Sequence, residues 1–137
     1  MKKTINILFI EDNLIELMKM NRTISLLKIK HKITEARSAD EAFSILEQKE
    51  YFPDIILLDL NMPKVSGIEF LSILKNNADL KHIPTIILTT SNNQKDLEKC
   101  YKIGVSGYIL KPLKYEDYVE KIKIVLSYWC INELIRP

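Results

Sequence analysis

The sequence has little of what marks secreted or membrane proteins. Its two cysteines, Cys100 and Cys130, form neither a CxxC pair nor a disulfide framework. Isolated thiols suit a reducing compartment, where a buried cysteine acts as a small hydrophobic residue. No uninterrupted apolar stretch approaches the roughly 20 residues of a membrane-spanning helix. The apolar run that follows Lys2 and Lys3 is too short for a signal peptide. We therefore expect a cytoplasmic protein without a membrane anchor.

The sequence also has few glycines and a small net charge. Only 3 residues are glycine, and 20 basic side chains are nearly balanced by 18 acidic ones, for a net charge of +2. Charges scattered in this way do not form the concentrated basic face that phosphate backbones require, so nucleic acid is not expected as a partner. The length of 137 residues and the 47% of hydrophobic residues correspond to one globular domain with a substantial core.

Hydrophobic periodicity predicts alternating strands and helices. Five short runs rich in Ile, Leu and Val are expected to be strands: residues 5–10, 31–36, 54–59, 85–90 and 106–110. The longer segments between them have apolar residues three and four positions apart, as amphipathic helices do. Residues that favour helix starts precede these segments at Ser38, Asp40, Ser66 and the SNN at 91–93.

Strands that alternate with helices form a parallel sheet covered on both faces, because a parallel crossover needs a dozen or more residues. The first, third and fourth runs are apolar on both faces, which predicts central strands, whereas 31–36 alternates and predicts an edge strand. The fold class is therefore α/β: a doubly wound five-stranded parallel sheet with five helices.

Polar side chains follow four of the predicted strands. Glu11 and Asp12 follow the first, Asp59 ends the third, Thr89 lies at the end of the fourth, and Lys111 follows the fifth. Each alone is typical of a solvated loop or a helix cap. Together they point to a ligand site, since all carboxyl ends of a parallel sheet meet at one edge, where ligands bind in folds of this kind.

Carboxylates gathered at this edge need a cation. Two unit charges ~4 Å apart repel by ~1 kcal/mol in water and by ~4 kcal/mol at an effective dielectric of 20. Lys111 supplies one charge, and an oxygen-only ligand set without His or Cys favours Mg²⁺. Because bound Mg²⁺ commonly carries phosphate oxygens, Asp59 is the natural nucleophile for a phosphoryl group, with Thr89 and Lys111 binding its oxygens.

Four motifs carry a family resemblance: "FIEDN" with Glu11 and Asp12, "LLDLNMPKVSG" with Asp59, "LTT" with Thr89, and "GYILKP" with Tyr108 and Lys111. In this order they resemble the receiver domains of two-component response regulators, of which the chemotaxis receiver is the smallest well-known member. The resemblance runs from the first strand to the last helix. It implies the flavodoxin-like receiver fold with strand order 2-1-3-4-5.

The resemblance also implies a reaction. Asp59 would accept a phosphoryl group from a phosphohistidine of a sensor histidine kinase or of a histidine phosphotransfer protein. Mg²⁺ would be held by Glu11, Asp12, Asp59 and the backbone carbonyl of Asn61. The protein would be a phosphoacceptor rather than an enzyme, with only slow hydrolysis of its own aspartyl phosphate.

Further implications concern the switch. Thr89 would move toward the phosphoryl group and Tyr108 would move inward, which changes the surface of the fourth helix, fifth strand and fifth helix. Family members commonly have a cis bond before the proline of the Lys-Pro pair, here Lys111–Pro112. At Thr90 the family usually has Ala or Gly, so this threonine is expected to alter the lifetime of the aspartyl phosphate.

The last segment, residues 115–135, is more apolar than one packed stripe requires. It predicts either an ordinary core face or a second face for self-association. The chain also resembles small stand-alone receivers that pair with bacterial phytochromes, several of which are homodimers. We expect residues 1–137 to form a single receiver domain without an output domain, and a homodimer through the fourth helix, fifth strand and fifth helix.

Other functions remain open at this point. The chain could be a pseudo-receiver that binds partners without phosphorylation, or an intermediate in a phosphorelay. Haloacid-dehalogenase-type phosphatases also place a nucleophilic aspartate after a parallel strand, but their second acidic residue, two positions on, is here Asn61. A phosphatase is therefore the least favoured of the alternatives.

Overall fold

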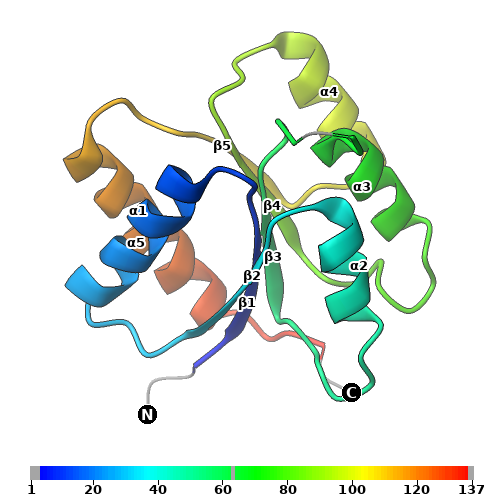
Figure 1. Ribbon diagram of the computed structural model, residues 1–137, viewed down its shortest axis with the longest axis horizontal. Helices are drawn as coiled ribbons and strands as arrows, with labels where there is room; N and C mark the ends of the chain where they lie inside the picture. Colours follow the sequence, from blue (N-terminus) through cyan, green and yellow to red (C-terminus); the bar gives the residue numbers. More distant parts are fainter. Residues whose placement is uncertain (1–3, 63, 136–137) are drawn as a thin grey trace.

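The computed structural model describes residues 4–62 and 64–135, which form a five-stranded parallel sheet in the order β2-β1-β3-β4-β5 (Figure 1). The strands are β1 (Asn6–Ile10), β2 (Lys32–Ala36), β3 (Ile55–Leu58), β4 (Thr85–Thr89) and β5 (Gly107–Leu110). The helices are α1 (Leu14–Leu26), α2 (Ala39–Leu46), α3 (Gly67–Lys75), α4 (Gln94–Ile103) and α5 (Tyr115–Cys130). The predicted doubly wound α/β fold and strand order are confirmed, and each strand lies within its predicted range.

The centre of the sheet is dry on both faces. Strands β3 and β4 are buried along their whole length, and β1 is buried after its first residue. The edge strands β2 and β5 are only partly buried. A strand covered by helices on both sides has no solvent face, so its sequence does not alternate. The predicted central strands and the predicted β2 edge are therefore confirmed.

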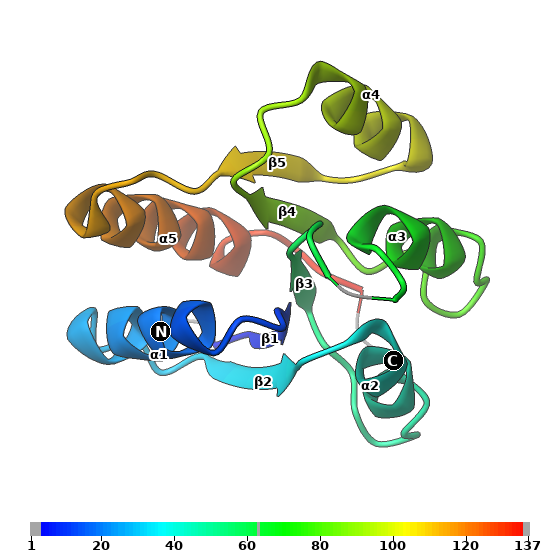
Figure 2. The same cartoon turned by 45° about the horizontal axis from the view of Figure 1, so that its top comes forward.

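Helices cover the sheet in two layers, with α1 and α5 on one face and α2, α3 and α4 on the other (Figures 1 and 2). Successive residues of a strand point to opposite faces. In β1, Leu8 accordingly joins the core that includes Phe70 of α3, and Phe9 joins the core that includes Tyr118 of α5. The two helical layers thus hold each central strand from both sides.

Side-chain caps begin four of the helices. Asn13, Ser38, Ser66 and Asn93 each accept a hydrogen bond from a backbone N–H in the first turn of α1, α2, α3 and α4. Such caps satisfy donors that have no partner within the helix. The helix starts predicted at Ser38, at Ser66 and in the SNN segment are confirmed.

Helix α5 ends earlier than the sequence suggested. The apolar pattern extends to residue 135, but the helix ends at Cys130. The side-chain amide of Asn132 donates to the Tyr128 carbonyl at 2.7 Å, and its backbone N–H donates to the Trp129 carbonyl at 3.2 Å. These bonds satisfy carbonyls of the last turn of α5.

The cysteines and the lengths of the helices bear on the expectations of no disulfide and no membrane anchor. Cys100 is buried, Cys130 is partly exposed, and both thiols are free. Within 4–62 and 64–135, every helix is too short or too polar to cross a lipid bilayer.

Candidate functional site

Strand ends hold the acidic residues in place. The Glu11 N–H, just after β1, donates to the Ala36 carbonyl at 2.9 Å, and the Asp59 N–H, just after β3, donates to the Ile10 carbonyl at 3.0 Å. The backbone of both residues therefore still follows the ladder of the sheet. Glu11 is only 1% exposed and Asp59 only 5%, whereas Asp12 is open to solvent. The strands thus carry two carboxylates out of the core without releasing them.

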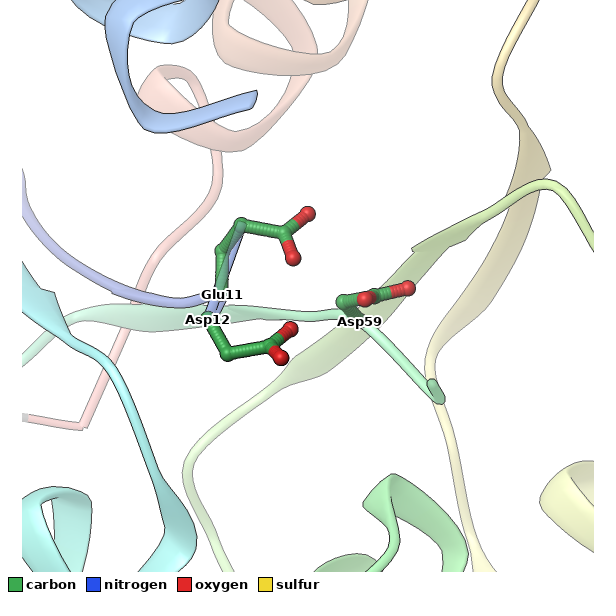
Figure 3. A group of neighbouring side chains, drawn as sticks. All are labelled: Glu11, Asp12 and Asp59. Atoms are coloured by element: carbon green, nitrogen blue, oxygen red, sulfur yellow. The ribbon is translucent and has the colours of Figure 1, made fainter. Parts of the chain in front are cut away.

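The three carboxyl groups lie together. Glu11, Asp12 and Asp59 each offer one oxygen, and these oxygens all lie within 4.8 Å of one another. Figure 3 shows Glu11 and Asp12 side by side at the end of β1, next to Asp59. They border a cleft of about 610 Å³ that Asn61, Thr90 and Lys111 also line. Carboxylates without His or Cys, open on one side to water, are the donor set that suits a hard divalent cation.

Lys111 partly compensates this negative charge. Its Nζ donates to Glu11 Oε1 at 2.8 Å and lies 3.9 Å from Asp59 Oδ1, and its side chain is only 5% exposed. The backbone N–H of Lys111 donates to the Thr89 carbonyl at 2.7 Å. The end of β5 therefore holds Lys111 beside the acidic residues.

The predicted cis bond between Lys111 and Pro112 is wrong for this structure, because no peptide bond among the described residues is cis. An X–Pro bond prefers trans by roughly 0.5–1 kcal/mol unless the surroundings demand the other isomer. Here the ammonium of Lys111 reaches Glu11 from the trans form. The local geometry therefore makes no demand for cis.

Electrostatics leave the site short of positive charge. Burial raises the pKa of Glu11 to about 7; the hydrogen bond and charge of Lys111 oppose this rise, and Asp59 adds to it. Burial alone would lower the pKa of Lys111, but its bond to Glu11 and the charges of Asp59, Glu11 and Glu16 outweigh burial and raise it. One ammonium thus does not offset the cost of burying the Glu11 carboxylate. A bound cation would.

The hydroxyl of Thr89 bonds to the following loop and does not line the cleft. It is completely buried at the end of β4, and its Oγ1 accepts a hydrogen bond from the Ser91 N–H at 3.2 Å. The neighbouring Thr90 is exposed and lines the cleft instead. The structure therefore brings together Glu11, Asp12, Asp59, Asn61 and Lys111, whereas the Thr89 hydroxyl does not border the cleft.

Tyr108 lies on β5, half-buried against the core under α4. Its hydroxyl donates to the Ser91 carbonyl at 2.9 Å. Burial raises the pKa of this phenol. Thr89 and Tyr108 therefore bond to the same residue, Ser91, in the loop between β4 and α4.

Two residues at the site were given no role in the sequence analysis. Glu16, in the first turn of α1, places its Oε2 3.7 Å from Lys111 Nζ. Gly67 begins α3, and a Cβ there would lie 2.5 Å from both the Asp59 carbonyl oxygen and Leu60 Cα. A signal for Gly67 existed, since it is one of only 3 glycines and follows the Asp59 strand closely. Glu16 gave none, because an acidic residue in a first helical turn is ordinary.

Comparison with known proteins agrees with this geometry. Residues 7–123 match the response regulator receiver domain. The chain is 35% identical over 127 residues to the probable methanogenesis regulatory protein FilR2 of Methanothrix harundinacea, covering 90% of this chain and 82% of that protein. It is 33% identical over 128 residues to the response regulator Rcp1 of Synechocystis, covering 90% and 87%.

Solved structures extend the likeness to stand-alone phytochrome response regulators. The phosphorylated cyanobacterial phytochrome response regulator RcpA is 29% identical and superimposes with a TM-score of 0.90, covering 97% of this chain and 99% of RcpA. The Mn²⁺-bound form of Rcp1 is 31% identical with a TM-score of 0.87, covering 96% and 99%. On fold, site and sequence together, this chain belongs to the response regulator receiver domain family.

Proposed function

We propose that this protein is a response regulator receiver that takes a phosphoryl group onto Asp59 from a sensor histidine kinase in a Mg²⁺-dependent reaction. The observation that carries the proposal is the grouping of buried Asp59 with Glu11 and Asp12 within 4.8 Å and with the Lys111 ammonium at 3.9 Å. A nucleophile, a cation site and a fixed positive charge thus meet in one cleft. These are the parts that phosphoryl transfer needs.

Each residue has a role in this reaction. Glu11, Asp12, Asp59 and the backbone carbonyl of Asn61 would hold Mg²⁺, which when bound neutralises charge on the phosphoryl oxygens. An oxygen of the Asp59 carboxylate attacks the phosphorus atom, the phosphorus–nitrogen bond to the donor imidazole breaks, and the electron pair of that bond stays on the imidazole. Lys111 stabilises negative charge on the transferred group. Thr89 and Tyr108 respond to the phosphorylated state through Ser91, which both contact.

The rim of the cleft suits a protein as the phosphodonor. Leu14 and Ile15 line the cleft on the first turn of α1, yet they are 57% and 73% exposed. Met18, one turn on, is 62% exposed. Apolar side chains left in water beside a reaction site favour a partner that covers them. We therefore infer a macromolecular donor, a histidine kinase of the phytochrome type or a histidine phosphotransfer protein.

A second apolar surface, on α5, supports the part of the proposed homodimer interface that α5 would form. On α5, Tyr118, Ile122 and Leu126 are buried against the sheet, but Ile124 is 58% exposed and Tyr128 is 55% exposed. The exposed pair is spaced four residues apart and so forms its own stripe. Light-scattering mass tests this part of the proposal, and a monomer at high concentration would refute it.

The reaction itself is tested by intact mass. The parent protein and an Asp59→Asn variant are incubated with Mg²⁺ and acetyl phosphate, with a chelator in a parallel sample. A gain of one phosphoryl group in the parent alone, abolished by the chelator, is the expected result. If the parent gains no mass from acetyl phosphate or from a panel of sensor kinases, the proposal fails and a pseudo-receiver takes its place.

A further inference from the structure

Glu16 has an unusual position for a residue outside the acidic group that could hold a metal. Its Oε2 is shielded from solvent and has no hydrogen-bond partner within 4–62 and 64–135. Two ammonium groups lie just beyond hydrogen-bonding distance of this oxygen, Lys111 Nζ at 3.7 Å and Lys19 Nζ at 3.8 Å. A carboxylate oxygen that is shielded from water and lacks a hydrogen-bond partner is unfavourable unless nearby charge compensates it. These two ammonium groups therefore lie where they compensate this oxygen.

Lys111 lies near three carboxylates, those of Glu11, Asp59 and Glu16, which would have different roles. Its short bond is to Glu11, which together with Asp59 belongs to the group able to hold a metal, whereas Glu16 does not belong to it. An oxygen that is engaged as a metal ligand interacts less with an ammonium, since both cations compete for the same electron pairs. Glu16 is then the remaining carboxylate beside Lys111.

We propose that Glu16 is a positioning residue, which holds the Lys111 ammonium beside Asp59 when Glu11 and Asp59 are engaged with a metal ion. This inference rests on the proposed function, because it concerns the same phosphoryl transfer. Glu16 touches neither Asp59 nor the metal group; it acts through Lys111. Its backbone is well placed for this, since the Glu16 N–H is fixed by the cap residue Asn13 at 3.2 Å.

The competing explanation is that Glu16 serves only helix α1. An acidic residue in the first turn interacts favourably with the helix dipole, and Glu16 with Lys19 forms an i,i+3 pair. The two roles separate experimentally, because Lys19→Gln removes the helix pair and leaves the contact with Lys111. Lys19 belongs neither to the group of Glu11, Asp12 and Asp59 nor to the residues that line the cleft.

The first measurement is a double-mutant cycle on the rate of phosphorylation by acetyl phosphate at saturating Mg²⁺. We expect Glu16→Gln to lower the rate roughly tenfold, within the range of coupling between residues in contact. In a Lys111→Met background the same change should have no further effect, and Lys19→Gln should leave the parent rate unchanged. A loss that persists in the Lys111→Met background, or no loss at all, would overturn the proposal.

The second measurement does not depend on phosphorylation. In ¹⁵N-lysine-labelled protein, the exchange of the Lys111 ammonium protons with water is compared with and without Mg²⁺. We expect exchange in the presence of Mg²⁺ to be several-fold faster in Glu16→Gln than in the parent; equal rates would overturn the proposal. If the parent itself takes no phosphoryl group, the proposed function fails, and this measurement alone decides the role of Glu16.

Melting temperatures show that each variant is folded. If Glu16→Gln does not fold, Glu16→Asp replaces it, because it keeps the charge but withdraws it by one methylene. The expected result is then a smaller loss in the same direction, again absent in the Lys111→Met background. An Asp variant equal to the parent in both rate and ammonium exchange would overturn the proposal.

Discussion

A substitution at Gly67 should both lower the stability of the fold and displace Asp59. A Cβ at this position would lie 2.5 Å from the Asp59 carbonyl oxygen and 2.5 Å from Leu60 Cα, where ordinary contact begins at 3.4 Å. Both obstacles are backbone atoms, so no side chain can rotate away. The Gly67 N–H also donates to the Leu60 carbonyl at 3.0 Å, which holds the two segments together. In Gly67→Ala, the backbone that carries Asp59 must therefore move.

The expected size of the effect follows from this clash. Overpacking of a tight site costs roughly 1–3 kcal/mol, and the better helix propensity of alanine offsets up to about 1 kcal/mol of that cost. For a domain of this size, each kcal/mol corresponds to about 3–5 °C in melting temperature. We expect Gly67→Ala to melt several degrees below the parent. Displacement of Asp59 should also slow phosphorylation by acetyl phosphate, since a misplacement of ~1 Å can cost ~100-fold.

Gly107→Ala is the matched control. A Cβ at Gly107 would meet the Ile86 side chain at 3.5 Å, an ordinary contact. This variant should stay within about 1 kcal/mol of the parent and keep its phosphorylation rate. The assays are thermal denaturation followed by circular dichroism, and intact mass over time. If Gly67→Ala and Gly107→Ala melt at the same temperature and react at the same rate, the reasoning from the close approach is refuted.

Other predictions concern single contacts. Burial lowers the pKa of His31, whose Nδ1 accepts a hydrogen bond from the Ile5 N–H at 3.0 Å; the nearby Asp54 opposes this shift. Because the folded-state pKa lies below the usual 6.5, the stabilisation is complete above pH 6.5 and is lost as the pH falls through the lower value. His31→Asn, which keeps an acceptor but does not titrate, should lose less melting temperature than the parent between pH 8 and pH 5; equal losses would contradict this. Tyr108→Phe removes the bond to the Ser91 carbonyl and should cost about 1 kcal/mol in urea denaturation, and an unchanged midpoint would show that this bond contributes nothing. Thr90 borders the cleft, so Thr90→Ala should open a path for water and speed loss of the phosphoryl group, measured as the decay of the phosphorylated mass; an unchanged decay rate would exclude steric control by Thr90.

Local sequence rules account for most of the fold. The runs around Ile7, Ile56 and Ile87 are apolar on both faces, and such runs are typical of parallel strands buried between helical layers. Polar residues directly after them, such as Asp59, were then bound to meet at one edge, because parallel strands all end on the same side. This is why the cluster of three acidic residues could be predicted from the sequence.

The sequence did not indicate relations that depend on contacts between distant segments. Glu16 and Lys111 are separated by most of the chain, and their approach depends on how the start of α1 and the segment after β5 meet at one edge of the sheet. The direction of the Thr89 hydroxyl, toward Ser91 rather than into the cleft, depends on the path of the following loop. Neither relation leaves a periodic pattern in the sequence.

The sequence pattern and the tertiary packing therefore determined different features of this protein. Periodicity and strand-end chemistry, which are properties of neighbouring residues, determined the α/β fold, the order of elements and the acidic site with Lys111. Tertiary packing alone decided the approach of Glu16 to Lys111, the direction of the Thr89 hydroxyl and the burial that raises the pKa of Glu11. Packing decides these because each depends on the free energy of contacts that form only after the helices have closed over the sheet.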